Sequence, residues 1–174
     1  MLDCGLLREG DPVELVGGHL VVREPQHAPH ATATRLVVQA LEAVFTGPFD
    51  VRAGLPVALD SESEPEPDVA VVRGAPRDYR EDHPARPVLV VEVAHSSLAF
   101  DRHYKASLYA RAGLADYWIV NLIDAQLEVY REPVPTPQAE FGWAYRQVTC
   151  LQPEALVAPL ALPDSRIRVA DLLP

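Results

Sequence analysis

The chain has 174 residues, 48% of them hydrophobic, and a formal net charge of −10 from 25 acidic and 15 basic side chains. This length and this apolar content predict one domain, residues 1–174, with a substantial core. The acidic balance argues against a protein that coats nucleic acid through general electrostatics. It argues less against a nuclease, because carboxylates that surround a divalent cation regain positive potential when the metal binds.

No segment of the sequence has the features of a membrane span or an export signal. No apolar run approaches the roughly 20 residues needed to cross a bilayer, and residues 1–4 lack the basic start and apolar run of a signal peptide. Cys4 and Cys150 are too few and too far apart to indicate a disulfide framework or a zinc site, so we expect two free thiols. We therefore expect a cytoplasmic protein with no membrane partner.

Hydrophobic patterning predicts a mixed sheet flanked by two main helices, which is an α/β or α+β fold with an N-terminal β-hairpin. Gly17-Gly18 supplies the positive φ angles of a tight hairpin turn, and Gly47-Pro48 and Gly113 supply helix stops. The predicted strands are a hairpin over residues 13–22, a bent strand over 49–59, buried strands over 68–72 and 87–93, a second hairpin over 115–122 and 126–130, and a strand over 142–150. The predicted helices cover about residues 30–46 and 101–112, with a short turn or helix at 169–173.

Three connecting segments have distinctive compositions. Residues 60–67 are rich in acid, serine and proline, which predicts an exposed loop. Residues 73–86 carry Arg73, Arg77, Arg80 and Arg86 and form the most basic segment, so we expect this loop to contact phosphate. The proline-rich run Glu132–Pro137 is expected to lie outside the sheet, because proline cannot donate a backbone hydrogen bond.

Two carboxylates occur at unusual places in the apolar strands. Glu92 interrupts the apolar run 88–94, and a buried carboxylate is costly unless it is paired, protonated or bound to a metal. Asp68 begins the other apolar strand, directly after Pro67. Each has a simple structural alternative: Glu92 could point into solvent at a strand end or pair with an arginine, and Asp68 could cap its own backbone. If the two strands are neighbours, the pair forms an oxygen-rich site of the kind that Mg²⁺ or Mn²⁺ prefers.

Lys105 is the only lysine in a chain with 14 arginines, so a positive charge alone does not explain the choice of residue. Lysine is a compact charge whose pKa can shift, whereas arginine is a planar fork that stays protonated. On the predicted helix Lys105 shares a face with Asp101 and Tyr109. A surface Asp101–Lys105 salt bridge worth a few tenths of a kcal/mol is one interpretation. The other places the ammonium beside a metal site, where it could orient or deprotonate water or stabilise charge on a phosphate.

The segment from Asp68 to Val120 resembles the Uma2 family, also called DUF820, and the weaker resemblance spans about residues 10–172. The residues that carry it are Pro67-Asp68-Val69, Leu89-Val90-Val91-Glu92-Val93, Ser96-Ser97, Asp101, Lys105, Tyr109 and Gly113-Leu114-Ala115-Asp116-Tyr117-Trp118-Ile119-Val120. The family consists of bacterial proteins regarded as endonucleases of the PD-(D/E)XK nuclease superfamily. The resemblance implies a restriction-endonuclease-like core, a central mixed sheet with flanking helices.

The resemblance also implies roles for individual residues. Asp68 matches the aspartate of the Pro-Asp motif and Glu92 the acid of the second motif, and both would bind Mg²⁺ or Mn²⁺ with the backbone carbonyl of Val93 as third ligand. The superfamily usually has a lysine two residues after that acid, where this chain has Ala94. In Uma2-like proteins the lysine has moved to the following helix, which points to Lys105. The predicted catalytic residues are thus Asp68, Glu92 and Lys105.

Other residues are weaker candidates for the site. His30 resembles a histidine near the helix start in the family and could lie at the mouth of the site. Glu24 and Glu42 could add a carboxylate, although a surface position is the better interpretation of both. Tyr109, Tyr117 and Trp118 are most simply core aromatics.

These residues support three hypotheses about function. The first is a Mg²⁺-dependent endonuclease that hydrolyses DNA phosphodiester bonds and acts as a homodimer. The second is a nuclease fold without activity that serves as a module for nucleic-acid or protein interaction, for which the acidic balance speaks. The third is a buried ion network that binds no ligand, in which case removal of one charge would strongly destabilise the fold.

Overall fold

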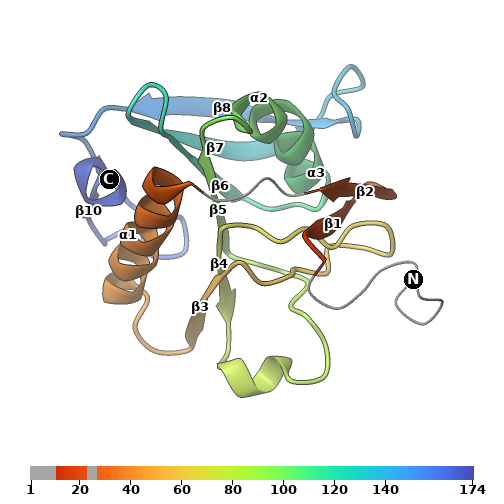
Figure 1. The fold of residues 1–174 in the computed structure, drawn as a ribbon, viewed down its shortest axis with the longest axis horizontal. Coiled ribbons are helices and arrows are strands. Elements are labelled where there is room, and N and C mark those ends of the chain that lie inside the picture. Colours follow the sequence, from red (N-terminus) through yellow and green to blue (C-terminus); the bar gives the residue numbers. More distant parts are fainter. Residues whose placement is uncertain (1–10, 23–26) are drawn as a thin grey trace.

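A computed structural model describes residues 11–22 and 27–174 of the chain. A six-stranded mixed sheet forms its centre, in the order β3-β4-β5-β6-β7-β8 (Figure 1). Its strands are β3 (Phe49–Ala53), β4 (Val69–Arg73), β5 (Leu89–Ala94), β6 (Asp116–Asn121), β7 (Gln126–Pro135) and β8 (Trp143–Leu151). The predicted mixed sheet is thus confirmed.

Within this sheet β5 and β6 run parallel, and the other neighbouring strands are antiparallel. A parallel pair needs a crossover connection, and here the helical segment of residues 98–111 supplies it. The predicted buried strands have their expected character, because every residue of β5 and of β6 is buried. A strand covered on both faces reads as a continuous apolar run, and this is why Glu92 stands out in the sequence.

Each face of the sheet has its own apolar core. Helix α1 (Ala28–Val44) packs on one face together with the C-terminal segment, which contains β9 (Leu156–Val157), β10 (Ile167–Arg168) and a 3-10 turn at Val169–Leu172. The other face is covered by helix α3 (Ala106–Arg111) and is rich in buried tyrosines, among them Tyr109 and Tyr117. Figure 1 shows α1 and α3 on the two sides of β5. The alternation along β5 turns Glu92 toward the α3 face, with Val90 and Ala94.

The helix predicted for residues 101–112 begins earlier than expected and is not regular. It consists of α2 (Leu98–Phe100), a π-helical turn at Asp101–Lys105 and α3. The start lies at Leu98 because this apolar side chain packs in the core, so Asp101 lies inside the helix. Single π-helical turns are common at functional sites.

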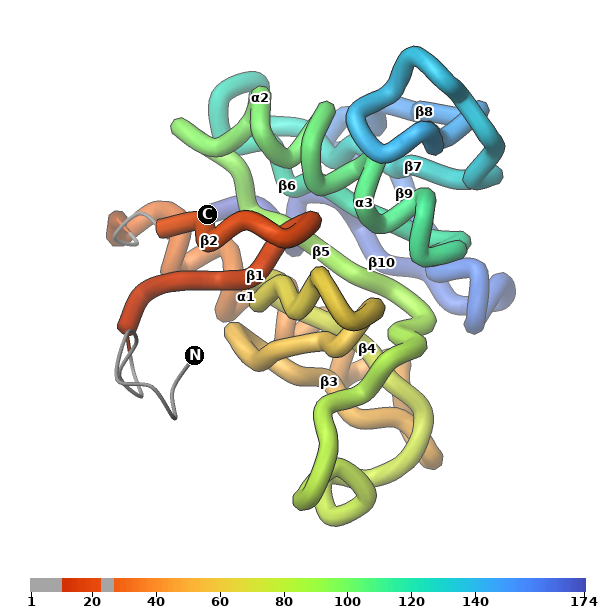
Figure 2. Tube along the Cα trace, turned by 90° about the vertical axis from the view of Figure 1, so that its right-hand side faces the viewer, coloured from red at the N-terminus to blue at the C-terminus, as the bar shows by residue number. Residues whose placement is uncertain are grey.

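The N-terminal hairpin is confirmed, with β1 (Val13–Val16) and β2 (His19–Val22) joined by two glycines at positive φ. It forms a separate two-stranded sheet that lies across the residues before β4, as Figure 2 shows. The prediction that residues 60–67 are an exposed loop is wrong for part of this segment. Ser63 is completely buried, and Glu64 forms a β-bridge with Leu15 of the hairpin.

The expectation that the proline-rich run lies outside the sheet is also wrong. Strand β7 continues to Pro135 and pairs with β8 as far as Trp143. Its other neighbour, β6, pairs only up to Arg131. Beyond that residue β7 is an edge on one side, where a missing proline N–H breaks no ladder bond.

Helix α1 agrees closely with its prediction: it begins two residues before the predicted start, with Pro29 in its first turn, a favoured position for proline. The strand predicted over residues 49–59 is shorter than expected, because β3 ends at Ala53 and the chain turns at Gly54, where φ is +59°. Across the described ranges, 11–22 and 27–174, no helix is long and apolar enough to cross a membrane.

Candidate active site

The pairing of β4 with β5 brings Asp68 and Glu92 together. The two strands are antiparallel with Val69 opposite Val91, so the residue before β4 lies opposite Glu92. The two side chains each bond to the other's strand: the Asp68 amide donates to Oε2 of Glu92 at 3.3 Å, and the Val93 amide donates to Oδ2 of Asp68 at 2.7 Å. The expected juxtaposition of two carboxylates at neighbouring strand ends is therefore present.

Glu92 is 3% exposed, yet neither of its oxygens lacks a partner. Its Oε1 accepts hydrogen bonds from the Lys105 ammonium at 3.0 Å and from the Tyr109 hydroxyl at 2.8 Å. Burial raises the pKa of Glu92 to about 8, against the opposing effect of Lys105 and with further contributions from Asp68 and Asp101. A bound divalent cation would lower the pKa of Glu92 again, because it favours the ionised carboxylate.

Lys105 projects from the π-helical turn into this group of carboxylates and is 6% exposed. Its Nζ lies 3.0 Å from Oε1 of Glu92 and 3.2 Å from Oε1 of Glu14. Burial alone would lower the pKa of Lys105, but Glu92, Glu14 and Asp101 outweigh it and raise the pKa above the ordinary value. Lys105 is thus a buried ammonium, and not half of a surface salt bridge with Asp101.

Asp101 belongs to the same buried group. Its Oδ2 accepts a hydrogen bond from the Ser97 hydroxyl at 2.6 Å. Burial raises the pKa of Asp101 to about 6, against the lowering effects of Lys105 and of the Ser97 hydrogen bond. The helix spacing of four residues predicted that Asp101 and Lys105 share a face, and the π-helical turn keeps both on the side of Glu92.

Glu14 is the site residue that the sequence analysis missed. It lies on β1, where alternate residues Glu14 and Val16 are buried, and its Oε2 accepts a hydrogen bond from the Glu66 amide at 3.0 Å. The alternation in this strand was the available signal, since Glu14 shares the face of the buried Val16. The carboxylates considered in its place do not fill this position: Glu42 is exposed on α1, and Glu24 lies outside the described residues.

His30 lies near the N-terminus of α1 with its Nε2 3.2 Å from Oδ2 of Asp68. The hydrogen bond to Asp68 raises the pKa of His30, although partial burial opposes it. The imidazole therefore orients one oxygen of Asp68 at the mouth of the site. Tyr109, Tyr117 and Trp118 are fully buried, as expected of core aromatics, and Tyr109 also reaches Glu92.

A cavity of about 810 Å³ opens onto these side chains. The hairpin, the start of α1 and the residues after β5 form its walls. Its acidic lining residues are Glu14, Glu66, Asp68, Glu92 and Asp101, and its basic ones are Lys105, His27, His30 and His95. The described part of the chain contributes no arginine to this lining.

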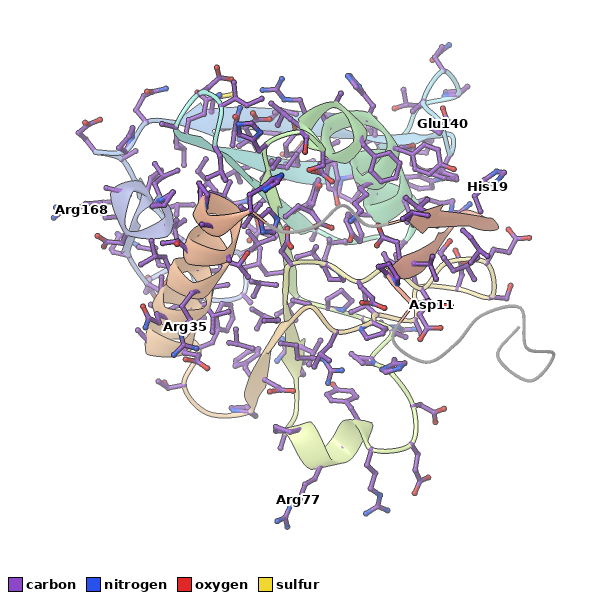
Figure 3. All side chains as sticks on the ribbon, in the orientation of Figure 1. Asp11, His19, Arg35, Arg77, Glu140 and Arg168 are labelled. Atoms are coloured by element: carbon purple, nitrogen blue, oxygen red, sulfur yellow. The ribbon has the colours of Figure 1, made fainter. Side chains whose placement is uncertain are left out.

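None of the arginine-bearing residues 73–86 lines this cavity. This loop joins the end of β4 to the start of β5, whereas Asp68 and Glu92 lie at the other ends of these strands. A five-residue strand spans roughly 16 Å. Figure 3 shows Arg77 at the foot of the molecule, away from Asp11 and His19 at the hairpin. The loop therefore does not belong to the cavity, and its contact with phosphate stays a prediction.

The donor set fits a hard divalent cation. The residues that the structure describes contain no ready-made group of three His, Cys, Asp or Glu side chains around one point. Mg²⁺, however, usually keeps several waters and takes only one or two protein carboxylates. Asp68 and Glu92 provide two adjacent carboxylates beside an open cavity, and Lys105 adds a positive charge to its lining.

A mixed sheet with flanking helices and acidic residues near the ends of two neighbouring strands is the arrangement expected of a restriction-endonuclease-like protein. The chain belongs to the Uma2 family, whose model, described as "Putative restriction endonuclease", matches residues 3–170. No curated protein matches the sequence.

A solved structure confirms the fold. It is described as a "putative nuclease belonging to DUF820" from Anabaena variabilis ATCC 29413 and is 18% identical to this chain. The TM-score is 0.71, and the match covers 98% of this chain and 96% of the other. At this level of identity the likeness establishes the restriction-endonuclease-like architecture.

Proposed function

We propose that the protein is a metal-dependent endonuclease that hydrolyses phosphodiester bonds in DNA. The observation that carries this proposal is the convergence of Asp68, Glu92 and Lys105 from two strands and a helix on one cavity. Membership of the Uma2 family supports it. The exposed free thiol of Cys150 agrees with a reducing compartment such as the cytoplasm.

In this proposal each residue has one task. Asp68, Glu92 and the backbone carbonyl of Val93 hold Mg²⁺ or Mn²⁺, which when bound lowers the pKa of a water and polarises the phosphate. His30 and the Val93 amide hold Asp68 in its orientation. Tyr109 does the same for Glu92.

Lys105 neutralises charge in this proposal and does not act as a base. Neighbouring carboxylates raise its pKa, so it stays protonated at neutral pH. An ammonium has three N–H donors, and one of them can bind an oxygen of the phosphate when the other two meet carboxylates. Of the roles open at the level of sequence, stabilisation of transition-state charge therefore fits best.

Calorimetry with Mn²⁺ and a DNA cleavage assay test the proposal together. We expect Asp68→Asn and Glu92→Gln to lose ion binding and cleavage. Lys105→Met should keep ion binding but cleave about 10²- to 10³-fold more slowly, the usual cost of losing one stabilising donor. Glu42→Gln, an exposed carboxylate on α1, is the matched control and should behave as wild type.

Two results would contradict the proposal. Metal-dependent cleavage that survives in Glu92→Gln or Lys105→Met would exclude these residues from catalysis. Wild-type protein that binds no divalent ion would leave an inactive interaction module, or a buried ion network if the variants are also strongly destabilised.

A further inference from the structure

Glu14 is a buried carboxylate that the proposed metal site does not use. It is 4% exposed, and a carboxylate in such a place is costly unless it is paired. Its two oxygens have separate partners: Oε1 lies 3.2 Å from the Lys105 ammonium, and Oε2 accepts the Glu66 amide. Glu14 therefore joins the only lysine of the chain to the segment before β4.

Glu92 alone is a poor anchor for Lys105 in a metal-bound enzyme. The oxygen that Lys105 contacts also accepts the Tyr109 hydroxyl. A metal ion bound by Asp68 and Glu92 would compete with Lys105 for the Glu92 carboxylate. The attraction between Glu92 and the Lys105 ammonium would then be weaker, because two cations share one anion. A second carboxylate outside the metal site would keep Lys105 in place.

The hairpin that carries Glu14 is itself fastened to the body of the protein. Leu15 forms a β-bridge with Glu64, and the amide of Gly18 donates to the Glu62 carbonyl at 2.8 Å. The amide of Gly17 donates to the hydroxyl of the buried Ser63 at 3.2 Å. These bonds fix the residues that follow Glu14, and the Glu66 amide holds the Glu14 carboxylate itself. The carboxylate is thus presented by a held strand and not by a free loop.

We propose that Glu14 is a positioning residue that holds the Lys105 ammonium beside the substrate phosphate while Glu92 serves the metal ion. The role of Lys105 at a substrate phosphate rests on the proposed nuclease function, whereas the contact between Glu14 and Lys105 does not. The N-terminal hairpin then has a defined role in the site: it carries Glu14, the second carboxylate that holds the Lys105 ammonium.

The single lysine makes the proposal measurable without any activity. Chain labelled with ¹⁵N at lysine Nζ gives one ammonium signal, which is visible in proton-detected NMR spectra only where hydrogen bonds slow proton exchange. We expect this signal in wild-type protein, both without metal and with saturating Mg²⁺. In the isosteric variant Glu14→Gln, proton exchange at Nζ should accelerate at least about tenfold, because the ion pair between Lys105 and Glu14 is lost.

Glu128→Gln is the matched control. Glu128 is also a buried carboxylate paired with a basic side chain of the same π-helical turn, Arg102, but it does not touch Lys105. We expect it to lower stability and to leave the Lys105 signal unchanged. A Glu14→Gln signal equal to that of wild type would overturn the proposal, and so would a wild-type signal broadened beyond detection.

A cleavage assay separates this proposal from the proposed function. Glu14→Gln should lower kcat about tenfold and leave the KM for DNA within twofold, since the ion pair that positions the Lys105 ammonium is lost. A higher KM with unchanged kcat would overturn the positioning role. If wild-type protein neither binds metal nor cleaves DNA but Glu14→Gln still loses the ammonium signal, the anchor stands and the nuclease function fails.

Discussion

Two buried polar clusters share the π-helical turn at Asp101–Lys105, which contributes side chains to both. The site cluster consists of Glu14, Asp68, Glu92, Asp101 and Lys105, and the Glu128 cluster consists of Arg102, Asn121, Glu128 and Tyr130. In the site cluster four carboxylates surround one cation. In the Glu128 cluster one carboxylate, 2% exposed, accepts two hydrogen bonds from Arg102 and one each from Asn121 and Tyr130.

The difference in charge balance appears in the pKa values. Burial raises the pKa of Glu92, and a single shared ammonium does not offset it. Burial also acts on Glu128, but its donors outweigh it and lower the pKa. A carboxylate with a complete set of donors stabilises the fold, whereas a group of carboxylates with too little positive charge is a candidate site for a cation.

The largest expected effect is on the Glu128 cluster. Glu128→Ala should lower the free energy of unfolding by about 3 kcal/mol, because it leaves Arg102 and two buried donors without their acceptor. Urea denaturation of metal-free protein measures this value. A loss below about 0.5 kcal/mol, typical of surface substitutions, would break the comparison by showing that this cluster does not stabilise the fold.

The pH dependence of stability should have opposite signs in the two clusters. Because the pKa of Glu92 rises from 4.5 to about 8 on folding, its contribution is fully present below 4.5 and is lost as pH rises through 8. The pKa of Glu128 is lowered, so its contribution is present above 4.5 and is lost as pH falls through the folded value.

Urea unfolding in the presence of a chelator at pH 5, 7 and 9 tests this contrast. Between pH 5 and 9, wild-type protein should lose stability relative to Glu92→Gln, which has no proton to release. The gap between wild type and Glu128→Gln should instead stay constant over this range. If the free energies of unfolding of wild type and Glu92→Gln change in parallel with pH, burial does not raise the pKa of Glu92.

The smallest expected effect comes from the hairpin turn. Gly17 has a φ of +57°, and a Cβ there would lie 2.4 Å from the ring of Phe141. Gly17→Ala should therefore cost about 1 to 2 kcal/mol, the usual penalty of a left-handed conformation, and should loosen the hairpin. Thermal denaturation measures the cost, and the Lys105 ammonium signal should weaken while the Glu128 cluster is unaffected. Gly18→Ala, with open space around its Cβ, separates the backbone penalty from the contact with Phe141.

The core of the site could be predicted because its signals are local. Glu92 interrupts a continuous apolar run, Asp68 follows a proline at the start of another, and the sequence contains one lysine. Asp68 and Glu92 meet through the pairing of neighbouring strands, and Lys105 reaches them from the helical segment that follows β5. Glu14 was not found because its contact with Lys105 spans 91 positions of the sequence and its strand is only four residues long.

The errors about the fold also have physical causes. Composition made residues 60–67 look exposed, but Ser63 is buried because the hairpin amide and Arg111 satisfy its hydroxyl. Prolines were excluded from β7 by a rule that holds for strands paired on both sides, and β7 has one neighbour beyond Arg131. The π-helical turn has no clear sequence signal, because its hydrogen bonds span only one residue more than those of an α-helix.

Because the single lysine is buried, cleavage of the chain at this residue reports local opening of the helical segment that contains it. A protease that cuts only after lysine has one target bond, which lies within the helical segment between β5 and β6. Since the Lys105 side chain is held inside the protein, digestion requires this helix to open, and its rate follows the population of the open form when reclosing is fast. The ratio of the digestion rates without and with a divalent ion would thus give the free energy by which the bound ion stabilises the unopened helix. No introduced label is needed.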